Sequence, residues 1–164
     1  MDKTVDKNSG SSSAVKQNDA LVEVKDLAVE FKTERATVHA LNGVSLQIRR
    51  GESLGLVGEA GAGKTTTALG ILNLMSKEAA RVRRGDITYN GQSVFTMSNR
   101  ELLEMRGGKV SMIFQNPLTS LNPVFTVGEQ IAMLLRKHRH MGRKEALKEA
   151  FHLLEMVGIA GSRI

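Results

Sequence analysis

A glycine-rich loop followed by lysine and threonine constrains this chain more than any other feature. Residues 58–65 read GEAGAGKT, which matches the P-loop pattern G-x-x-x-x-G-K-[ST]. The apolar run before it, residues 53–57, suits a buried parallel strand, and residues 66–74 after it suit a helix. A strand, a glycine-rich loop and a helix in this order predict a phosphate-binding site.

The glycines of this loop give the backbone conformations that a Cβ would forbid. Gly58, Gly61 and Gly63, with Ala62 among them, are expected to turn successive N–H groups toward phosphate oxygens. The helix that starts near Lys64 adds unpaired N–H groups and the positive end of its dipole. A glycine-rich hairpin or an ordinary helix start is the structural alternative, but neither requires the Lys-Thr pair.

The residues after the last glycine have separate expected roles. Lys64 would reach the β and γ phosphates of a nucleotide through charge-assisted hydrogen bonds. Thr65 would place its hydroxyl on Mg²⁺, and Thr66 would donate toward the α phosphate.

Composition limits the other functions. The chain has 164 residues, of which 41% are hydrophobic and none is cysteine, so we expect one domain or part of one, without disulfides or thiolate metal sites. No apolar run approaches the roughly 20 residues that span a bilayer. The formal charge is +6, but aromatic residues make up only 4% and tryptophan is absent, so a nucleic-acid platform is not expected.

The basic residues gather in two groups and favour no single function. Their alternatives are a solvated face and attraction to an anionic membrane leaflet. The groups are Arg81, Arg83 and Arg84, and then Arg136, Lys137, Arg139, Arg143, Lys144 and Lys148. The four histidines show no pattern for acid–base chemistry, and the pair His138 and His140 is a weak metal signal.

Local patterns predict the order of elements along the chain. Residues 1–19 have the composition of a disordered tail. Alternating apolar residues predict strands over 22–31 and 44–48, Asn90-Gly91 predicts a tight hairpin turn, and residues 110–114 suit a second buried strand. Helices are expected over 101–106, from a capping box at residues 126–129 to about 137, and over 143–157 with Gly158 at its end.

With these motifs in place, residues 21–164 resemble the nucleotide-binding subunits of ATP-binding-cassette (ABC) transporters. Residues 110–130, VSMIFQNPLTSLNPVFTVGEQ, are similar to the Q-loop region of the subfamily that imports dipeptides, oligopeptides and nickel. Residues 38–46, VHALNGVSL, resemble the opening strands of that subfamily. The loop departs from it at Ala60 and Ala62, where serines are common.

The resemblance implies an α/β fold of the P-loop NTPase class, present as a partial ABC ATPase domain after the tail. An antiparallel β subdomain and the P-loop core, with the start of a parallel sheet, would occupy residues 20–115. The Q-loop and the start of a helical subdomain would occupy residues 115–164. ATP and Mg²⁺ are the implied cofactors.

The resemblance also implies two further site residues. Phe31 falls where the family stacks adenine on an aromatic ring, although it also fits the alternating core face of its strand. Gln115 would complete the Mg²⁺ shell or orient the attacking water, so Gln115 and Lys64 are the expected catalytic residues. The stretch after Gln115 would contact the membrane-spanning subunits.

The implied function is ATP binding and hydrolysis coupled to import of peptides or nickel. The partners would be membrane-spanning permease subunits, a second ABC ATPase subunit and, indirectly, a solute-binding protein, at the cytoplasmic face of the inner membrane. The family's Leu-Ser-Gly-Gly-Gln signature, its second acidic motif and its late histidine do not occur in these 164 residues. We therefore expect a chain truncated before these motifs, which binds ATP with little or no hydrolysis by itself.

Two alternatives stand beside this function. The chain could be a non-catalytic module that binds nucleotide or the transporter. It could also belong to another P-loop class, a regulatory GTPase or a small-molecule kinase, but the Asn-Lys-x-Asp motif for guanine is absent and a kinase would not explain residues 115–130.

Overall fold

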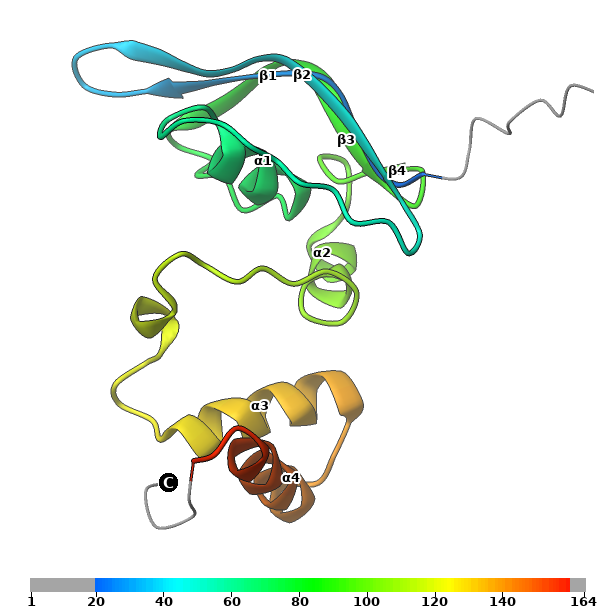
Figure 1. Cartoon of the computed structure of the whole chain (residues 1–164), viewed down its shortest axis with the longest axis vertical. Helices are drawn as coiled ribbons and strands as arrows, with labels where there is room; N and C mark the ends of the chain where they lie inside the picture. The colour runs from blue at the N-terminus through cyan, green and yellow to red at the C-terminus, as the bar shows by residue number, and fades with distance from the viewer. Residues whose placement is uncertain (1–19, 160–164) are drawn as a thin grey trace, which may run out of the picture. The chain divides into compact units, whose positions relative to one another are not determined.

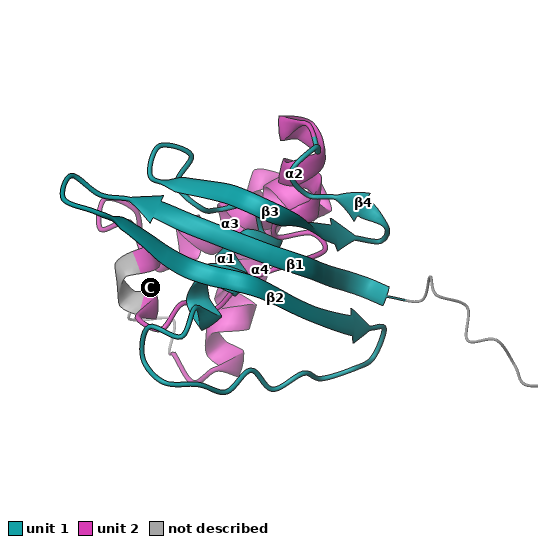
Figure 2. Cartoon of the chain, turned by 90° about the horizontal axis from the view of Figure 1, so that it is seen from above, with its two compact units in different colours: residues 1–97 teal, residues 98–164 magenta. Residues whose placement is uncertain are grey.

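A computed structural model describes residues 20–159, and its backbone divides into two compact units after Met97. Figure 2 shows the first unit in teal and the second in magenta. Each unit is described separately below. The predicted tail, residues 1–19, lies outside the described residues.

The first unit is a four-stranded antiparallel sheet with one helix. The strand order is β2-β1-β3-β4, and the helix α1 contacts β3 and β2 (Figure 1). The bounds are β1 Ala20–Lys32, β2 Thr37–Arg49, α1 Lys64–Ile71, β3 Ala80–Tyr89 and β4 Gln92–Ser93.

Alternation of apolar residues builds the core of this unit. On β1 the buried side chains are those of Val22, Val24, Leu27 and Val29, and on β3 the side chain of Ile87 is fully buried. Since successive side chains of a strand point to opposite faces, one face of the sheet packs inward and the other faces solvent. The antiparallel, half-buried strands predicted from the sequence are confirmed.

A bulge at Asp26 interrupts this alternation. Asp26 has φ 47°, and the glycines beside it on β2 and β3, Gly43 and Gly85, have φ 84° and 85°. The N–H of Asp26 donates to Ser45 Oγ at 2.9 Å, and its carboxylate accepts from Arg84 Nε at 2.6 Å and Nη2 at 3.0 Å. The register of β1 against both β2 and β3 shifts at this point. The break in the alternation of side chains is therefore a β-bulge of the sheet.

The hairpin predicted at Asn90-Gly91 joins β3 to β4. Both residues have positive φ, 49° and 78°, as a two-residue hairpin turn requires. Tyr89 then pairs with Gln92, and Thr88 pairs with Ser93.

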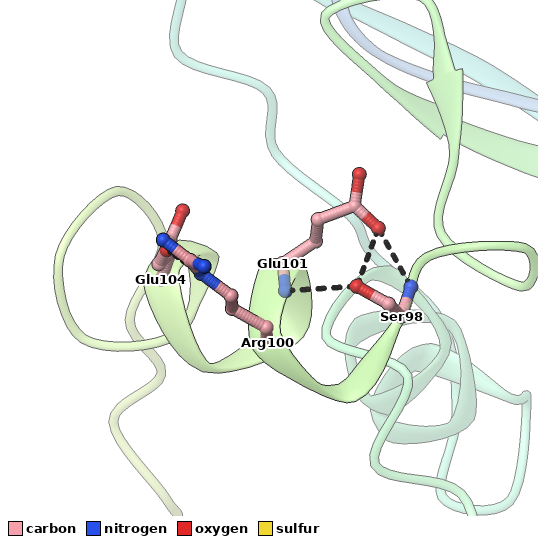
Figure 3. A network of polar contacts seen from close by, with 4 residues as sticks. All are labelled: Ser98, Arg100, Glu101 and Glu104. Atoms are coloured by element: carbon pink, nitrogen blue, oxygen red, sulfur yellow. Dashed lines mark hydrogen bonds and ion pairs between the residues drawn. The ribbon is translucent and has the colours of Figure 1, made fainter.

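The second unit begins with a short helix that has a complete capping box. This helix, α2, spans Asn99–Met105. Ser98 Oγ accepts from the N–H of Glu101 at 3.3 Å, while the Glu101 carboxylate accepts from the N–H and the hydroxyl of Ser98, each at 2.7 Å (Figure 3). Arg100 and Glu104 form an ion pair one turn apart, at 3.0 Å. The helix predicted at residues 101–106 is confirmed, with an earlier start.

Two longer helices pack together in this unit after a 3₁₀ turn, Pro117–Ser120. The helix α3 spans Val127–Arg139, and Thr126 and Glu129 form the predicted capping box at its start. The helix α4 spans Arg143–Met156. Their contact buries one group of small and branched side chains, namely Ala132, Leu135, Ala146 and Ala150.

The end of α4 has the predicted glycine cap. The N–H of Gly158 donates to the carbonyl of Glu155, and that of Ile159 to the carbonyl of Leu154, with φ 82° at Gly158. The predicted apolar stripe is only partly right, because Phe151 is exposed and Val157 is 71% exposed. These two residues point away from the face that meets α3.

Two segments predicted as buried strands form no strand in the structure. They are residues 53–57 and 110–114, in which Val57 is 95% exposed and Ile113 is 91% exposed. The strands of the described sheet pair antiparallel, and the one parallel pairing found within residues 20–159 is a bridge between Arg106 and Val110. A strand needs a hydrogen-bonding neighbour, and the expected parallel sheet has none among the described residues.

The bulge yields a stability prediction. Replacing Gly85 with alanine adds a Cβ that would overlap the backbone carbonyls of Lys25 and Asp26. We expect Gly85→Ala to lower the free energy of unfolding by about 2 kcal/mol or more beyond the loss from Gly91→Ala, since Gly91 has a similar φ but no atom near its Cβ position. Chemical denaturation followed by circular dichroism measures the difference. Equal losses in the two variants would contradict this account of the bulge.

Candidate functional site

The start of α1 lies unusually close to the sheet. Gly63 caps this helix in the left-handed conformation, with φ 85°. A Cβ at this position would overlap the side chain of Leu41 on β2 and would stand 2.8 Å from the carbonyl oxygen of Ala40. Only glycine satisfies both the backbone conformation and this approach, so the last glycine of the motif fixes where the helix begins.

No side chain caps α1 or α4, whereas side chains cap α2 and α3. Gly63 supplies no side-chain acceptor for the first-turn N–H groups, whereas Ser98 and Thr126 supply one at α2 and α3. The first N–H groups of a helix have no partner within it, and the helix dipole favours negative charge there. The start of α1 is therefore suited to bind an anion.

The side chain of Lys64 lies across the loop. Its Nζ donates to the carbonyl oxygens of Gly58 at 2.5 Å and Glu59 at 2.7 Å. The N–H of Ala62 also donates to the carbonyl of Glu59, at 3.2 Å, which forms a tight turn within the loop. This conformation places a positive charge over an exposed, glycine-rich stretch of backbone.

The three threonines after Lys64 differ in exposure. Thr65 is exposed and Thr66 is half-buried. Thr67 is buried, and its hydroxyl donates to the carbonyl of Gly63 at 3.0 Å. No sequence pattern indicated the roles of Thr67 and Leu41, which hold Gly63 in place from the helix and from β2.

Phe31 lies near the end of β1, opposite Val38 on β2 and Ala80 on β3. It is half-buried. Its unit also contains the loop, but no described contact joins its ring to Lys64. Stacking of adenine on Phe31 remains a prediction.

Gln115 is exposed and belongs to the second unit, where it follows residues 110–114, which form no strand. Lys64, Thr65 and Thr66 belong to the first unit. A common magnesium or catalytic site for Gln115 and Thr65 therefore remains a prediction.

Much of the basic charge in the first group is paired within the fold. Arg83 lies 3.4 Å from a carboxylate oxygen of Glu30, whose other oxygen lies 3.2 Å from His39 Nδ1. Arg84 binds Asp26, as described above. These pairs favour a structural role for this group over a surface that attracts anions.

One member of the second basic group, Lys137, lines an open hollow of about 730 Å³ in the second unit. Besides Lys137 it is lined by Arg100, Glu104, Lys109, His138 and His140. Both α2 and α3 end near these residues, and helix C-termini favour nearby cations.

In residues 20–159, no cluster of three or more His, Cys, Asp or Glu side chains suits a metal ion, and no helix is long and apolar enough to cross a membrane.

Comparison with known proteins decides the family. The model of the ABC transporter family matches residues 41–164, which include the P-loop and the Q-loop region. The chain belongs to the ABC transporter family.

Its relatives include peptide transport proteins. The chain is 44% identical over 142 residues to a probable peptide ABC transporter ATP-binding protein of Sinorhizobium fredii, a match that covers 87% of this chain and 42% of the relative. It is 43% identical over 139 residues to the oligopeptide transport ATP-binding protein OppD of Bacillus subtilis, covering 85% of this chain and 39% of that protein. The chain thus spans about two fifths of the length of these relatives.

Solved structures agree on the fold. The dimeric ATP-binding cassette MJ0796, in a post-hydrolysis state bound to ADP and phosphate, matches with a TM-score of 0.70 at 26% identity. The match covers 86% of this chain and 59% of the cassette. The predicted α/β fold of the P-loop ATPase class is confirmed.

The close approach at Gly63 gives a second prediction. We expect Gly63→Ala to lower the free energy of unfolding by about 2 kcal/mol or more relative to Gly51→Ala, because Gly51 also has positive φ but no atom near its Cβ position. Hydrogen exchange should also become faster in α1. Equal stability of the two variants, measured by denaturant unfolding, would show that α1 does not depend on this contact.

Proposed function

We propose that this chain is the ATP-binding part of an ABC importer for peptides. The observation that carries the proposal is the ammonium group of Lys64, held over the loop at a helix start that no side chain caps. A triphosphate is the ligand whose charge and shape suit this arrangement. The relatives are named as peptide transport proteins, and from those names we infer that the cargo is a peptide.

Binding of ATP would exchange the partners of Lys64. Its Nζ would leave the carbonyls of Gly58 and Glu59, which are neutral acceptors, for charged phosphate oxygens. Hydrogen bonds between charged groups contribute about 1.5 to 3 kcal/mol, which corresponds to roughly 10- to 150-fold in affinity. The N–H groups of the loop and of the first turn of α1 would hold the rest of the phosphate chain.

Magnesium would be held chiefly by phosphate oxygens and by the exposed hydroxyl of Thr65, since Mg²⁺ usually takes few protein ligands. Gln115 would complete its shell or orient the attacking water when the Q-loop approaches. Hydrolysis further requires a second carboxylate and a positioned base. The motifs that supply these in the family do not occur in the 164 residues, so we propose nucleotide binding with little turnover for this chain alone.

The proposed partners follow from the importer assignment. Membrane-spanning permease subunits would contact the stretch after Gln115, a second ABC ATPase subunit would pair with this one, and a solute-binding protein would act indirectly. The chain would lie peripherally at the cytoplasmic face of the inner membrane. Nickel remains a second possible cargo, and a non-catalytic module that binds nucleotide or transporter remains the alternative function.

Nucleotide binding tests the proposal directly. We expect Lys64→Ala to weaken binding of Mg-ATP by roughly 10- to 150-fold, because the charge-assisted bonds to phosphate are lost. Lys77→Ala, an exposed lysine of the same unit, is the matched control and should bind as the wild type does. Isothermal titration calorimetry with ATP and GTP measures both variants. A strong preference for GTP, or unchanged affinity in Lys64→Ala, would refute the assignment.

Hydrolysis tests the role of Gln115. We expect no measurable turnover from the chain alone, but Mg²⁺-dependent ATP hydrolysis from a fusion with the part of Bacillus subtilis OppD that follows the matched region. In that fusion Gln115→Ala should lower the rate at least about tenfold, because the water or the metal loses a ligand. Gln47→Ala, an exposed glutamine on β2, should leave it unchanged. An inactive fusion would count against the importer ATPase.

A further inference from the structure

The side chain of Gln130, in the second turn of α3, holds the loop that precedes this helix. The N–H of Asn122 donates to Gln130 Oε1 at 3.0 Å. Gln130 Nε2 donates to the carbonyl oxygens of Asn122 and Phe125, each at 3.0 Å. Both donors and the acceptor of the amide are therefore used, and all three bonds go to the backbone of one loop.

This clamp is separate from the capping box of α3. Thr126 and Glu129 bond each other at the start of the helix. Gln130 instead reaches back as far as Asn122, eight residues earlier. Within the loop, the Asn122 side chain accepts from the N–H of Val124 at 3.0 Å. The capping box fixes where α3 begins, and Gln130 fixes the loop before it.

The clamped loop presents apolar side chains to solvent. Val124 is 81% exposed and Phe125 is 46% exposed, and Leu121 is also exposed. Phe125 further lines a hollow of about 150 Å³ between α3 and α4, together with Ala132, Met133 and Leu147. Apolar side chains held on the surface by a fixed backbone are typical of a surface that binds a partner.

The rim of this hollow limits the chemistry of the partner. Its charged residues are two arginines, Arg136 and Arg143, and one carboxylate, that of Glu129. A space of about 150 Å³ accepts one apolar side chain of the size of leucine or phenylalanine. A segment with one such anchor beside an acidic residue would match both the floor and the rim.

We propose that Gln130 is a positioning residue that holds the 121–125 loop ready to dock on the membrane-spanning subunits. The identity of this partner rests on the proposed function, whereas the clamp rests on the contacts above. A loop that is already ordered loses less conformational entropy when it binds. Loss of the clamp should therefore weaken docking without changing nucleotide binding, in which Gln130 has no role.

The first arm of the test is hydrogen exchange in the free chain. Gln130→Met keeps the length of the side chain and removes all three bonds, so exchange of the Asn122 and Val124 amides should become at least about tenfold faster, with α3 still protected. Gln130→Glu keeps the acceptor but sets a carboxylate oxygen against the carbonyls of Asn122 and Phe125, so it should also speed exchange at Asn122. Gln47→Met, the same change at an exposed glutamine on β2, is the matched control. Unchanged exchange in Gln130→Met overturns the clamp whatever the partner is.

The second arm is binding to the membrane-spanning subunits of the Bacillus subtilis oligopeptide transporter in lipid nanodiscs. We expect Gln130→Met to bind roughly tenfold more weakly than the wild type, with the same affinity for Mg-ATP, and Gln47→Met to bind normally. Faster exchange with unchanged docking overturns the positioning role. If the wild type binds ATP but not these subunits, the proposed partner and the docking role both fail, while the exchange arm still decides the clamp.

Discussion

The approach of Gly63 to β2 is the contact on which the candidate site depends. Because this residue has no Cβ, the start of α1 can lie directly against Leu41 and the carbonyl of Ala40. The buried hydroxyl of Thr67 then holds the Gly63 carbonyl from the helix side. These two contacts fix the start of α1. Because Lys64 follows Gly63 directly, they also fix where Lys64 lies over the loop.

The four described α-helices differ in how they start: a side chain caps α2 and α3, whereas a glycine stands at the capping position of α1 and of α4. Ser98 with Glu101, and Thr126 with Glu129, satisfy first-turn N–H groups from within the chain, so neither helix offers those donors to a ligand. At α1 the capping position is a glycine. A glycine at the capping position gives up only about a few tenths of a kcal/mol relative to a capping side chain, which a bound anion can replace.

Features set by neighbours in sequence were predictable, and those set by distant partners were not. The hairpin at Asn90-Gly91, the capping box at Thr126 and the cap at Gly158 each depend on a few adjacent residues. The bulge at Asp26 depends on glycines of two other strands, and the exposure of Phe151 depends on which face of α4 meets α3. The hydrogen bonds between Gln130 and Asn122 were also not predictable, because a glutamine in a helix is usually solvated. At the site, the pattern predicted the loop and the start of α1, but not Leu41 or Thr67 as their supports.

Two segments that form no strand show which contacts hold the P-loop in this chain. Residues 53–57 lead directly into the P-loop, and residues 110–114 lead into Gln115, yet neither segment has a strand neighbour among the described residues. Pairing in a parallel sheet therefore does not set the loop geometry here. The bonds from Lys64 to the loop carbonyls and the contact of Gly63 with β2 do, and both lie within the first unit. The phosphate-binding part of the site is thus fixed by contacts within the first unit.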